Sequence, residues 1–245
     1  GGPVRADVDA LGGGLGLSGT AEARALGRWA GVAGIDDLAS GRFAWQGRLA
    51  MGENRLHLGL DSGLEGLGID LPAPLGKGSG ERRPLRLDMD LAERRLEGRL
   101  GDDLALRWRA LPGDGPGQGQ VWLGRPPTAG WPAGEGWWVD AYQPRLAPAA
   151  WAEALGGLGG LAGGGGSPAL RELRLVSDCL VDDGRCLGSL TAEARPQAGG
   201  GWRVALDGSL LSGLLDYRPS LAEALDISLT RLSLDGLTPQ PETVG

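Results

Sequence analysis

The residues of this chain that could do chemistry are few and far apart. Among 245 residues there is one histidine, His57, and there are two cysteines, Cys179 and Cys186. One histidine and two cysteines cannot complete the usual four-ligand zinc site. A Ser-His-Asp triad would have to use His57, with no nucleophile-elbow motif nearby. Since His57 lies on the polar phase of an alternating segment, we interpret it as a solvated strand residue and expect no metal site.

Two glycine-containing motifs partly match nucleotide-binding loops. Residues 14–19, GLGLSG, fit the GxGxxG pattern, and Asp36 and Asp37 follow about 20 residues later. However, the preceding segment alternates polar and apolar residues, whereas the strand of a dinucleotide-binding unit is buried on both faces. Around Lys77, the sequence GKGS lacks the first glycine of a phosphate loop, and we interpret it as an exposed loop. We therefore expect no cofactor.

Carboxylate pairs and a tryptophan cluster leave a hydrolase as one alternative. Asp88 with Asp90, and Asp102 with Asp103, could act as general acid and base. The first pair occupies the outward phase of an alternating segment and the second lies in a turn, so solvated charge is the simpler interpretation. Four tryptophans lie between the two halves of the chain: Trp122, Trp131, Trp137 and Trp138. Such a cluster can stack sugars or bases, although packing is the commoner role.

The two cysteines flank a turn at residues 182–185. A disulfide needs Cα atoms within about 7 Å, and two strands of one hairpin can provide that separation. Cys179 and Cys186 are therefore either a disulfide or a pair of free thiols, and the residue types alone do not decide between them.

Composition excludes several classes of protein. Twenty-four basic and 31 acidic side chains give a formal net charge of -7, which argues against nucleic acid as a partner because phosphate binding needs a basic surface. Hydrophobic residues make up 41% of the chain, enough for a buried core and too many for a disordered chain. No apolar run approaches the ~20 residues that span a bilayer, and no signal peptide opens the sequence. The first residues of the sequence are those expected of a fragment of a longer protein.

Apolar and polar residues alternate through most of the chain, which is typical of strands with one apolar face. The clearest segment is 85–91, LRLDMDL. Hairpin turns are predicted at 61–63, 101–103, 182–184 and 199–201. The apolar phase shifts after Leu229, which predicts a β-bulge near Thr230 and Arg231. Short connections of this kind indicate antiparallel pairing, because parallel strands need long crossovers.

Two segments with helical spacing divide the strands into repeated units. One runs from Ala21 to Ser40 and the other from Pro148 to Leu155, where proline is tolerated in the first turn. Residues 156–166 are predicted to form a glycine-rich loop. We expect residues 1–20 to complete a preceding repeat. Residues 21–138 would form a helical connector plus a β repeat, and residues 139–245 a second connector and repeat.

One continuous string resembles a known family. Residues 66–77, GLGIDLPAPLGK, followed by RPLRL at 83–87, are similar to the signature region of the YhdP branch of the AsmA-like proteins. Weaker likenesses follow in order along the chain at 139–142, 184–188, 201–204, 211–213 and 217–219. The cysteine pair and the glycine-rich stretch after Leu155 depart from that pattern.

The resemblance implies a fold, a function and a location. The family contains large envelope proteins of Gram-negative bacteria, with an inner-membrane anchor and a long periplasmic β structure. Their likeness to bridge-like lipid transfer proteins implies a strongly curved antiparallel sheet that forms a repeated β-groove, a taco-like trough with short helical connectors. It also implies that this fragment carries phospholipid between inner and outer membranes, possesses no catalytic site, and has envelope proteins as further partners.

Alternation and the resemblance together predict the groove lining. The predicted lipid-binding residues are Leu56, Leu58, Leu60, Leu67, Ile69, Leu71, Leu85, Leu87, Met89, Leu91, Leu104, Leu106, Val204, Leu206, Ile227 and Leu229. Alternation does not show whether this apolar phase meets lipid or a second sheet. A closed β-sandwich scaffold or protein-interaction module of the envelope is therefore the main alternative.

Overall fold

The fold is almost entirely β-structure. The computed structural model describes residues 4–11, 14–24, 38–52, 55–113, 115–156, 170–198, 200–218 and 224–233. Contacts between residues divide the chain into two compact units, one formed by Gly1–Trp137 with Ala150–Ala169 and the other by Trp138–Ala149 with Leu170–Gly245. Each unit is described separately below.

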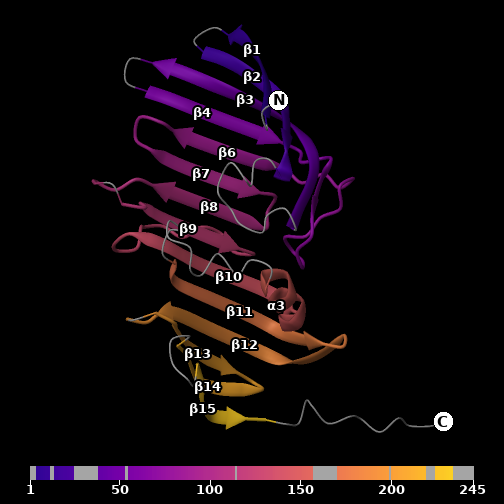
Figure 1. Cartoon of the computed structure of the whole chain (residues 1–245), viewed down its shortest axis with the longest axis vertical. Helices are drawn as coiled ribbons and strands as arrows, with labels where there is room; N and C mark the ends of the chain where they lie inside the picture. The colour runs from indigo at the N-terminus through magenta and orange to yellow at the C-terminus, as the bar shows by residue number, and fades with distance from the viewer. Residues whose placement is uncertain are drawn as a thin grey trace, which may run out of the picture. The chain divides into compact units, whose positions relative to one another are not determined.

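The first unit contains an open antiparallel sheet (Figure 1). Its strands are β1 (Val4–Leu11), β2 (Gly14–Glu22), β3 (Ala39–Gly52), β4 (Arg55–Ser62), β5 (Leu67–Ile69), β6 (Leu85–Asp90), β7 (Arg95–Leu100), β8 (Leu104–Arg109) and β9 (Gln118–Leu123). Each strand pairs with the next in chain order, except that β4 pairs with β6 and the short β5 pairs with β3.

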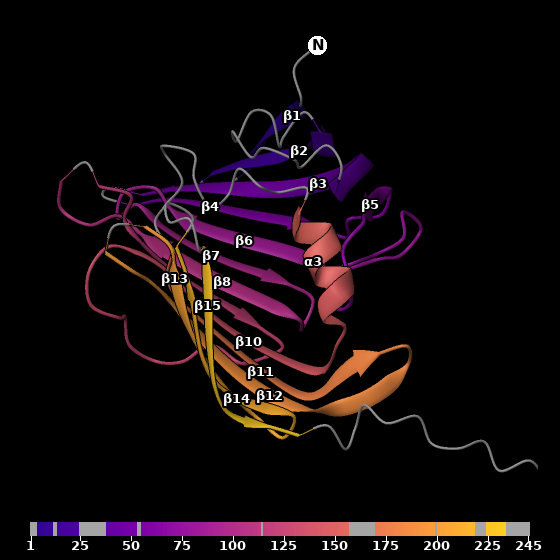
Figure 2. The ribbon, with the colours of Figure 1, turned by 60° about the horizontal axis from the view of Figure 1, so that its bottom comes forward.

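The second unit contains a similar sheet with longer hairpins. Its strands are β10 (Gly136–Leu146), β11 (Leu170–Asp182), β12 (Arg185–Pro196), β13 (Trp202–Gly208), β14 (Leu211–Tyr217) and β15 (Leu225–Leu232). Strands β11 to β15 form consecutive antiparallel pairs. Figure 2 shows that the strands of each unit twist and curve. The predicted fold class, mainly β with an open, curved sheet, is confirmed.

The predicted helices have different outcomes. The helix predicted at 148–155 is confirmed as α3 (Pro148–Gly156). The connector predicted from Ala21 to Ser40 falls mostly on residues 25–37, which lie outside the described residues, as does the loop predicted at 157–166. At the two ends of the connector, β2 continues to Glu22 and β3 begins at Ala39. There, pairing of Ala21 with Phe43 outweighs the helix propensity of alanine. The described residues just inside these ends, Ala23, Arg24 and Leu38, are helical.

Local irregularities follow the sequence in most cases. The β14–β15 register shifts where Ser212 pairs with Arg231 and Gly213 with Leu229, which leaves Thr230 as the extra residue and confirms the predicted bulge. Turns at 101–103 and 183–184 separate consecutive strands as predicted, although Asp182 still belongs to β11. Of the turn predicted at 199–201, residues 200 and 201 lie between β12 and β13, and residue 199 lies outside the described residues. The hairpin predicted at 61–63 is wrong, because β4 runs through Ser62 and a long loop leads to β6.

That long loop packs a small core against one edge of the first sheet. Ala23, Leu64 and Leu67 are buried there, and partly buried hydrophobic residues pack against them, namely Ala39, Phe43, Ile69, Leu85 and Leu100. The predicted strand through residue 71 ends at Ile69, since the proline that follows Leu71 restricts its backbone and cannot donate to a ladder. The core therefore lies at an edge of the sheet, and does not cover the middle of either face.

Candidate functional site

The candidate site is the apolar side of the first sheet. Strand pairing sets Leu49 directly opposite Leu58, Leu58 opposite Met89, and Met89 opposite Leu96. The row ends on Trp108 of β8. Directly opposed side chains lie about 4.5–5.5 Å apart at Cβ, so they form a continuous row at a right angle to the strands.

Two more rows run beside the first. One consists of Leu17, Gly47, Leu60, Leu87, Gly98, Leu106 and Val121. The other consists of Ser62, Leu85, Leu100, Leu104 and Leu123. We call these three rows the apolar face. From β2 to β9 the middle row crosses seven paired strands, which at ~4.8 Å per strand corresponds to about 29 Å.

Glycines in the middle row let neighbouring leucines meet above the backbone. A Cβ added to Gly98 would lie 2.9 Å from Cδ2 of Leu87 and 3.1 Å from Cγ of Leu106. The two leucines thus lean over the position where a side chain would stand. The backbone is covered by hydrocarbon at this position, and no polar side chain interrupts the row.

The apolar face is open within the described part of the first unit. Leu60, Leu87 and Leu106 are half-buried, and at one end Met51 and Leu56 are 53% and 37% exposed. Among the described strands of this unit no second sheet packs on the face, since all belong to one path apart from β5, which pairs with β3. Leucines in a closed sandwich would instead be fully buried.

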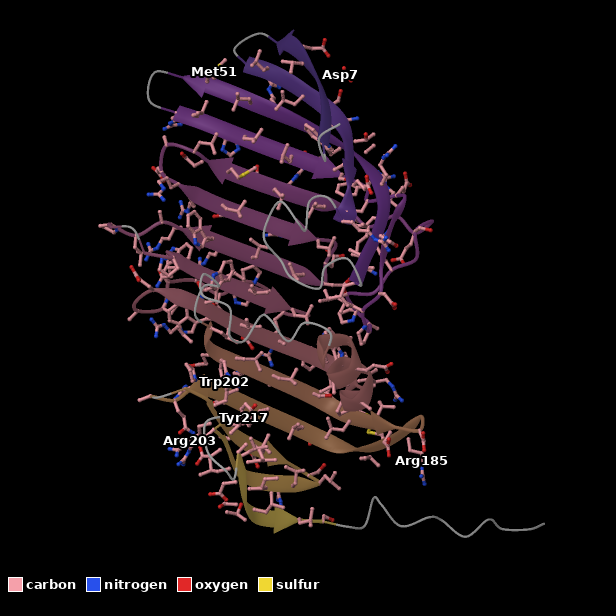
Figure 3. All side chains as sticks on the ribbon, viewed as in Figure 1. Asp7, Met51, Arg185, Trp202, Arg203 and Tyr217 are labelled. Atoms are coloured by element: carbon pink, nitrogen blue, oxygen red, sulfur yellow. A yellow bond between two sulfur atoms is a disulfide. The ribbon has the colours of Figure 1, made fainter. Side chains whose placement is uncertain are left out.

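The second unit repeats this division between faces. Across β12, β13 and β14, Ala194 pairs with Val204 and Val204 with Leu215, while Leu206 pairs with Ala192. Ile227 and Leu229 of β15 are 52% and 44% exposed. Trp202 and Tyr217 pair at one end of the β13–β14 ladder, and the neighbouring Arg203 belongs to the opposite face (Figure 3).

The predicted lining residues fall into two groups. Strand register places those of β4, β6 and β8 in or beside the three rows, and those of β13 and β15 on the apolar side of the second sheet. The others lie outside these strands. Leu67, Ile69 and Leu71 are in β5 and the loop after it, and Leu91, which is 43% exposed, is in the turn after β6. Leu67 is 7% exposed within the edge core. Their proposed contact with lipid stays a prediction, as does that of the first group.

Sequence reasoning missed further members of the apolar side. Leu49 in β3, Leu96 and Leu100 in β7, and Val121 and Leu123 in β9 share its rows. Alternation was present in each segment, but glycines at positions 47, 98 and 119 interrupted it. Counting glycine as neutral within an alternating run would have found them.

The opposite side of the first sheet is polar and carries cross-strand ion pairs. Asp61 Oδ1 lies 2.9 Å from Arg86 Nε, and His57 Nε2 lies 3.4 Å from Asp88 Oδ1. Asp90 Oδ1 accepts hydrogen bonds from the backbone nitrogens of residues 92 and 93 and so caps the β6–β7 turn. The two aspartates of the candidate acid–base pair therefore have separate structural partners.

The tryptophan cluster is divided between the two sides of the sheet. On the polar side, the guanidinium of Arg107 lies 5.1 Å from the ring centre of Trp122 and 4.2 Å from that of Trp131. Burial lowers the pKa of Arg107, against the opposing effect of the Glu97 carboxylate. Trp137 instead packs against Gly119, a residue paired with Trp108 of the apolar face. The arrangement is packing and does not form one stacking platform.

Lys77 corrects the interpretation of its loop. Its side chain is 6% exposed, and Nζ donates to the carbonyls of Leu64 at 2.9 Å, Leu67 at 2.5 Å and Gly78 at 3.0 Å. The loop is therefore not an exposed one at this position. All three ammonium donors are occupied by the backbone, so Lys77 is not placed to hold a phosphate.

The remaining candidates for chemistry are structural. Residues 14–19 lie inside β2, and not at the strand-to-helix turn that a dinucleotide site requires. Cys179 and Cys186 are joined by a disulfide between β11 and β12, with Cα atoms 5.4 Å apart. Within the described residues there is no group of three or more His, Cys, Asp or Glu side chains that could hold a metal ion. Nor does any described helix have the length and apolarity to cross a membrane.

Comparison with known proteins gives one match. A family model described as YhdP protein matches residues 1–244, so the chain belongs to the YhdP family. This is a lipid-transport family of the cell envelope and not an enzyme family. No curated protein and no solved structure matches the chain.

Proposed function

We propose that this member of the YhdP family is part of a periplasmic bridge that carries phospholipid between the inner and outer membranes. The acyl chains would lie on the apolar face while the head groups stay in water. The observation that carries the proposal is the middle row of the apolar face, which runs without a polar side chain from β2 to β9. The apolar side of the second sheet would serve the same purpose.

The rows match the dimensions of a lipid tail. Each leaflet contributes about 15 Å to a hydrocarbon core that is ~30 Å thick. The middle row, at about 29 Å, is longer than one tail. A tail on this row would therefore have room to move along it without leaving hydrocarbon contact.

Energetics favour a continuous apolar surface over release into water. Exposing one methylene to water costs roughly 0.8 kcal/mol, so two tails of about 16 carbons would cost on the order of 20 kcal/mol or more. An uninterrupted row removes that barrier because each step replaces one hydrocarbon contact by another. Transfer of this kind requires no nucleophile or metal.

Partial exposure of the leucines supports lipid as the occupant. Half-buried Leu60, Leu87 and Leu106 form a contiguous apolar patch, and large exposed patches of this type are unfavourable in water unless they are covered. Leucine side chains provide contact without hydrogen bonds, so the surface would accept tails of many lipids. We expect phospholipid to copurify with the chain.

Replacing Leu87 by aspartate tests the proposal. Leu87→Asp puts a charge at the centre of the middle row, and we expect it to abolish copurifying phospholipid and block transfer between donor and acceptor vesicles. Solubility and secondary structure should change little, because the residue is only half-buried. The measurements are lipid extraction with mass spectrometry and a fluorescent lipid-transfer assay.

The matched control is Ala50→Asp, which introduces the same charge on the polar side of β3, where Ala50 pairs with His57. It should keep its lipid. Equal lipid content in both variants, or no lipid in the unmodified chain, would contradict the proposal. Wholesale misfolding of Leu87→Asp alone would instead favour the closed scaffold.

A further inference from the structure

We propose that the polar side of the first sheet carries a second site, which binds a doubly charged phosphate group through Arg82, Arg86 and Arg99. The ligand class is inorganic phosphate or a phosphate monoester. This inference does not depend on the apolar face, since it concerns the opposite side of the sheet.

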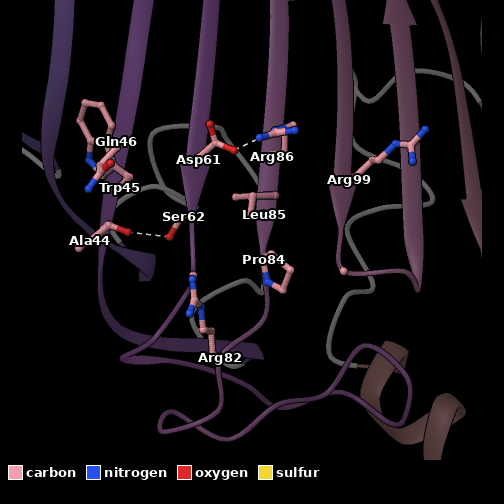
Figure 4. Close-up of a pocket in the computed structure, with 12 residues that line it drawn as sticks. Ala44, Trp45, Gln46, Asp61, Ser62, Arg82, Pro84, Leu85, Arg86 and Arg99 are labelled. Atoms are coloured by element: carbon pink, nitrogen blue, oxygen red, sulfur yellow. Dashed lines mark hydrogen bonds and ion pairs between the residues drawn. The ribbon is translucent and has the colours of Figure 1, made fainter.

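The site is a pocket of about 560 Å³ over β3, β4, β6 and β7 (Figure 4). Its lining includes the three arginines, Gln46 and Asp61. The volume lies within the range of small-molecule sites, which is roughly 300–1,000 Å³. Gln46, Asp61, Arg86 and Arg99 occupy strand positions that alternate with those of the apolar face. Ser62 and Leu85, which belong to the third row of that face, border the same pocket at the ends of β4 and β6.

The charges in the pocket are unbalanced. Arg86 pairs with Asp61, but Arg99 stands directly opposite Arg86 on β7, and its other neighbour across the sheet is Ala105. Like charges directly opposite each other destabilise a sheet. Within the described residues neither Arg82 nor Arg99 has an ion-pair partner. Three guanidinium groups against one carboxylate leave two positive charges in a chain whose net charge is -7.

The backbone around the pocket is fixed. The nitrogen of Arg83 donates to Gly63 O at 2.8 Å, and the nitrogen of Gly101 donates to Pro84 O at 2.7 Å. The guanidinium of Arg83 donates to the carbonyls of Pro74, Leu75 and Gly76 at 2.7–3.1 Å. Arg82 therefore extends from a braced segment, which lowers the entropy lost when it binds a ligand.

The excess of two charges selects the ligand class. A phosphate monoester carries about -1.5 to -2 charges at pH 7 and presents three acceptor oxygens. Arginine forks match such oxygens in bidentate geometry. A carboxylate or a phosphodiester would bring a single charge and would leave one guanidinium unbalanced.

An adjoining pocket gives the ligand room beyond its phosphate. It shares Arg86 and Arg99 with the first pocket and has a volume of about 140 Å³. Two carboxylates, Asp88 and Glu97, line it together with Arg107 and Pro127. An organic group attached to the phosphate could extend along β7 and β8 into this space.

Titration of the 245-residue chain with inorganic phosphate tests the site. We expect saturable binding by calorimetry, weakened about tenfold or more by Arg99→Gln and by Arg82→Gln, because each removes a charge-assisted hydrogen-bond donor. The control is Arg48→Gln, which removes an exposed arginine from the polar side of the sheet. Arg48 belongs to β3 and lines neither pocket. Binding should also weaken from pH 7 to pH 5, because inorganic phosphate takes up a proton and loses its second charge over this range.

Vesicles distinguish a lipid head group from a soluble ligand. The probe is phosphatidylcholine vesicles containing phosphatidic acid, a monoester, or phosphatidylglycerol, a diester. If the chain cosediments with phosphatidic acid vesicles and Arg99→Gln abolishes this binding, the phosphate belongs to a lipid head group. If the chain binds free phosphate but not the vesicles, the ligand is a soluble monoester. Both outcomes support the site. Absence of saturable phosphate binding, equal loss in Arg48→Gln and Arg99→Gln, or the same affinity at pH 5 and pH 7 would overturn it.

Discussion

At the scale of single residues, polar groups of this chain serve mainly as braces. Lys77 and Arg83 each hold three backbone carbonyls of the loop between β4 and β6. Sequence analysis interpreted Lys77 as exposed because lysine is almost never buried without partners. Its partners are carbonyls, which every residue carries, so no pattern of side chains could have revealed them.

Replacing Lys77 by methionine should destabilise this loop. The change keeps the length of the side chain but leaves the carbonyls of Leu64, Leu67 and Gly78 without their donor, and we expect a loss of about 2–3 kcal/mol in the free energy of unfolding. Urea unfolding followed by circular dichroism measures it. Gly78→Ala is the control, because nothing lies within 4 Å of the added Cβ. A loss no larger than in the control would contradict the bracing role.

Asp216 gives the second sheet a pH dependence. Hydrogen bonds from Arg203, at 2.8 and 3.0 Å, hold the pKa of Asp216 below its ordinary value. A lowered folded-state pKa means that the unfolded chain takes up the proton first as the pH falls. Stability from this carboxylate is therefore present above about pH 4, the ordinary value, and is lost as the pH drops through the lowered pKa.

The variant Asp216→Asn should make unfolding less sensitive to acid. Below about pH 4, we expect the stability of the variant to fall less steeply than that of the unmodified chain. Asp226→Asn is the matched control, since Asp226 pairs with Asp216 across the sheet and is exposed. Unfolding midpoints measured from pH 2 to pH 7 provide the comparison. Parallel curves for the unmodified chain and Asp216→Asn would refute the assignment.

At the scale of secondary structure elements, strands were predictable because one side of each sheet is apolar. The alternation of residues 85–91 predicted β6 and the side of the sheet that each of its residues occupies. The phase change after Leu229 predicted the bulge at Thr230. The sequence prediction ended the strand at residue 20, two residues before β2 ends, because alanine favours helices when it lacks a strand partner. β5 depends on pairing with β3 far away in sequence, so its short length could not be read locally.

The disulfide between β11 and β12 is a link that the sequence alone could not distinguish from a pair of free thiols. It closes the β11–β12 hairpin over a separation of seven residues. Loop-closure entropy for such a short loop corresponds to about 2.5 kcal/mol. We expect reduction, or the double change Cys179→Ala and Cys186→Ala, to lower the free energy of unfolding by about that amount.

Thiol labelling with and without reductant reports the bond directly. The unreduced chain should react with no more than traces of a thiol reagent under denaturing conditions, and the reduced chain with two equivalents. Complete labelling before reduction would show that Cys179 and Cys186 are free in solution.

At the scale of the whole chain, the proposed function depends on apolar residues that contact the acyl chains of bound lipid. The fold class followed from alternation and family likeness, but openness did not, because alternation is the same whether a second sheet or a lipid covers the leucines. Leu67 is buried in the edge core, and Leu85 and Leu100 of the third row pack against that core. Leu60, Leu87 and Leu106 of the middle row remain half-buried. Whether an apolar side chain is covered depends on which loops pack against the sheet. Only the tertiary structure shows this.

Photo-cross-linking at adjacent positions within each of three strands tests the central claim most directly. A photoreactive amino acid would replace Leu58, Leu87 or Leu106 on the apolar face, and in separate variants His57, Asp88 or Arg107 on the polar side. After incubation with vesicles of radiolabelled phosphatidylcholine, a diester that the proposed phosphate site does not match, we predict lipid adducts at the three leucine positions and none at the other three. Equal labelling at adjacent positions, or no labelling at any leucine, would contradict an acyl-chain path along this face.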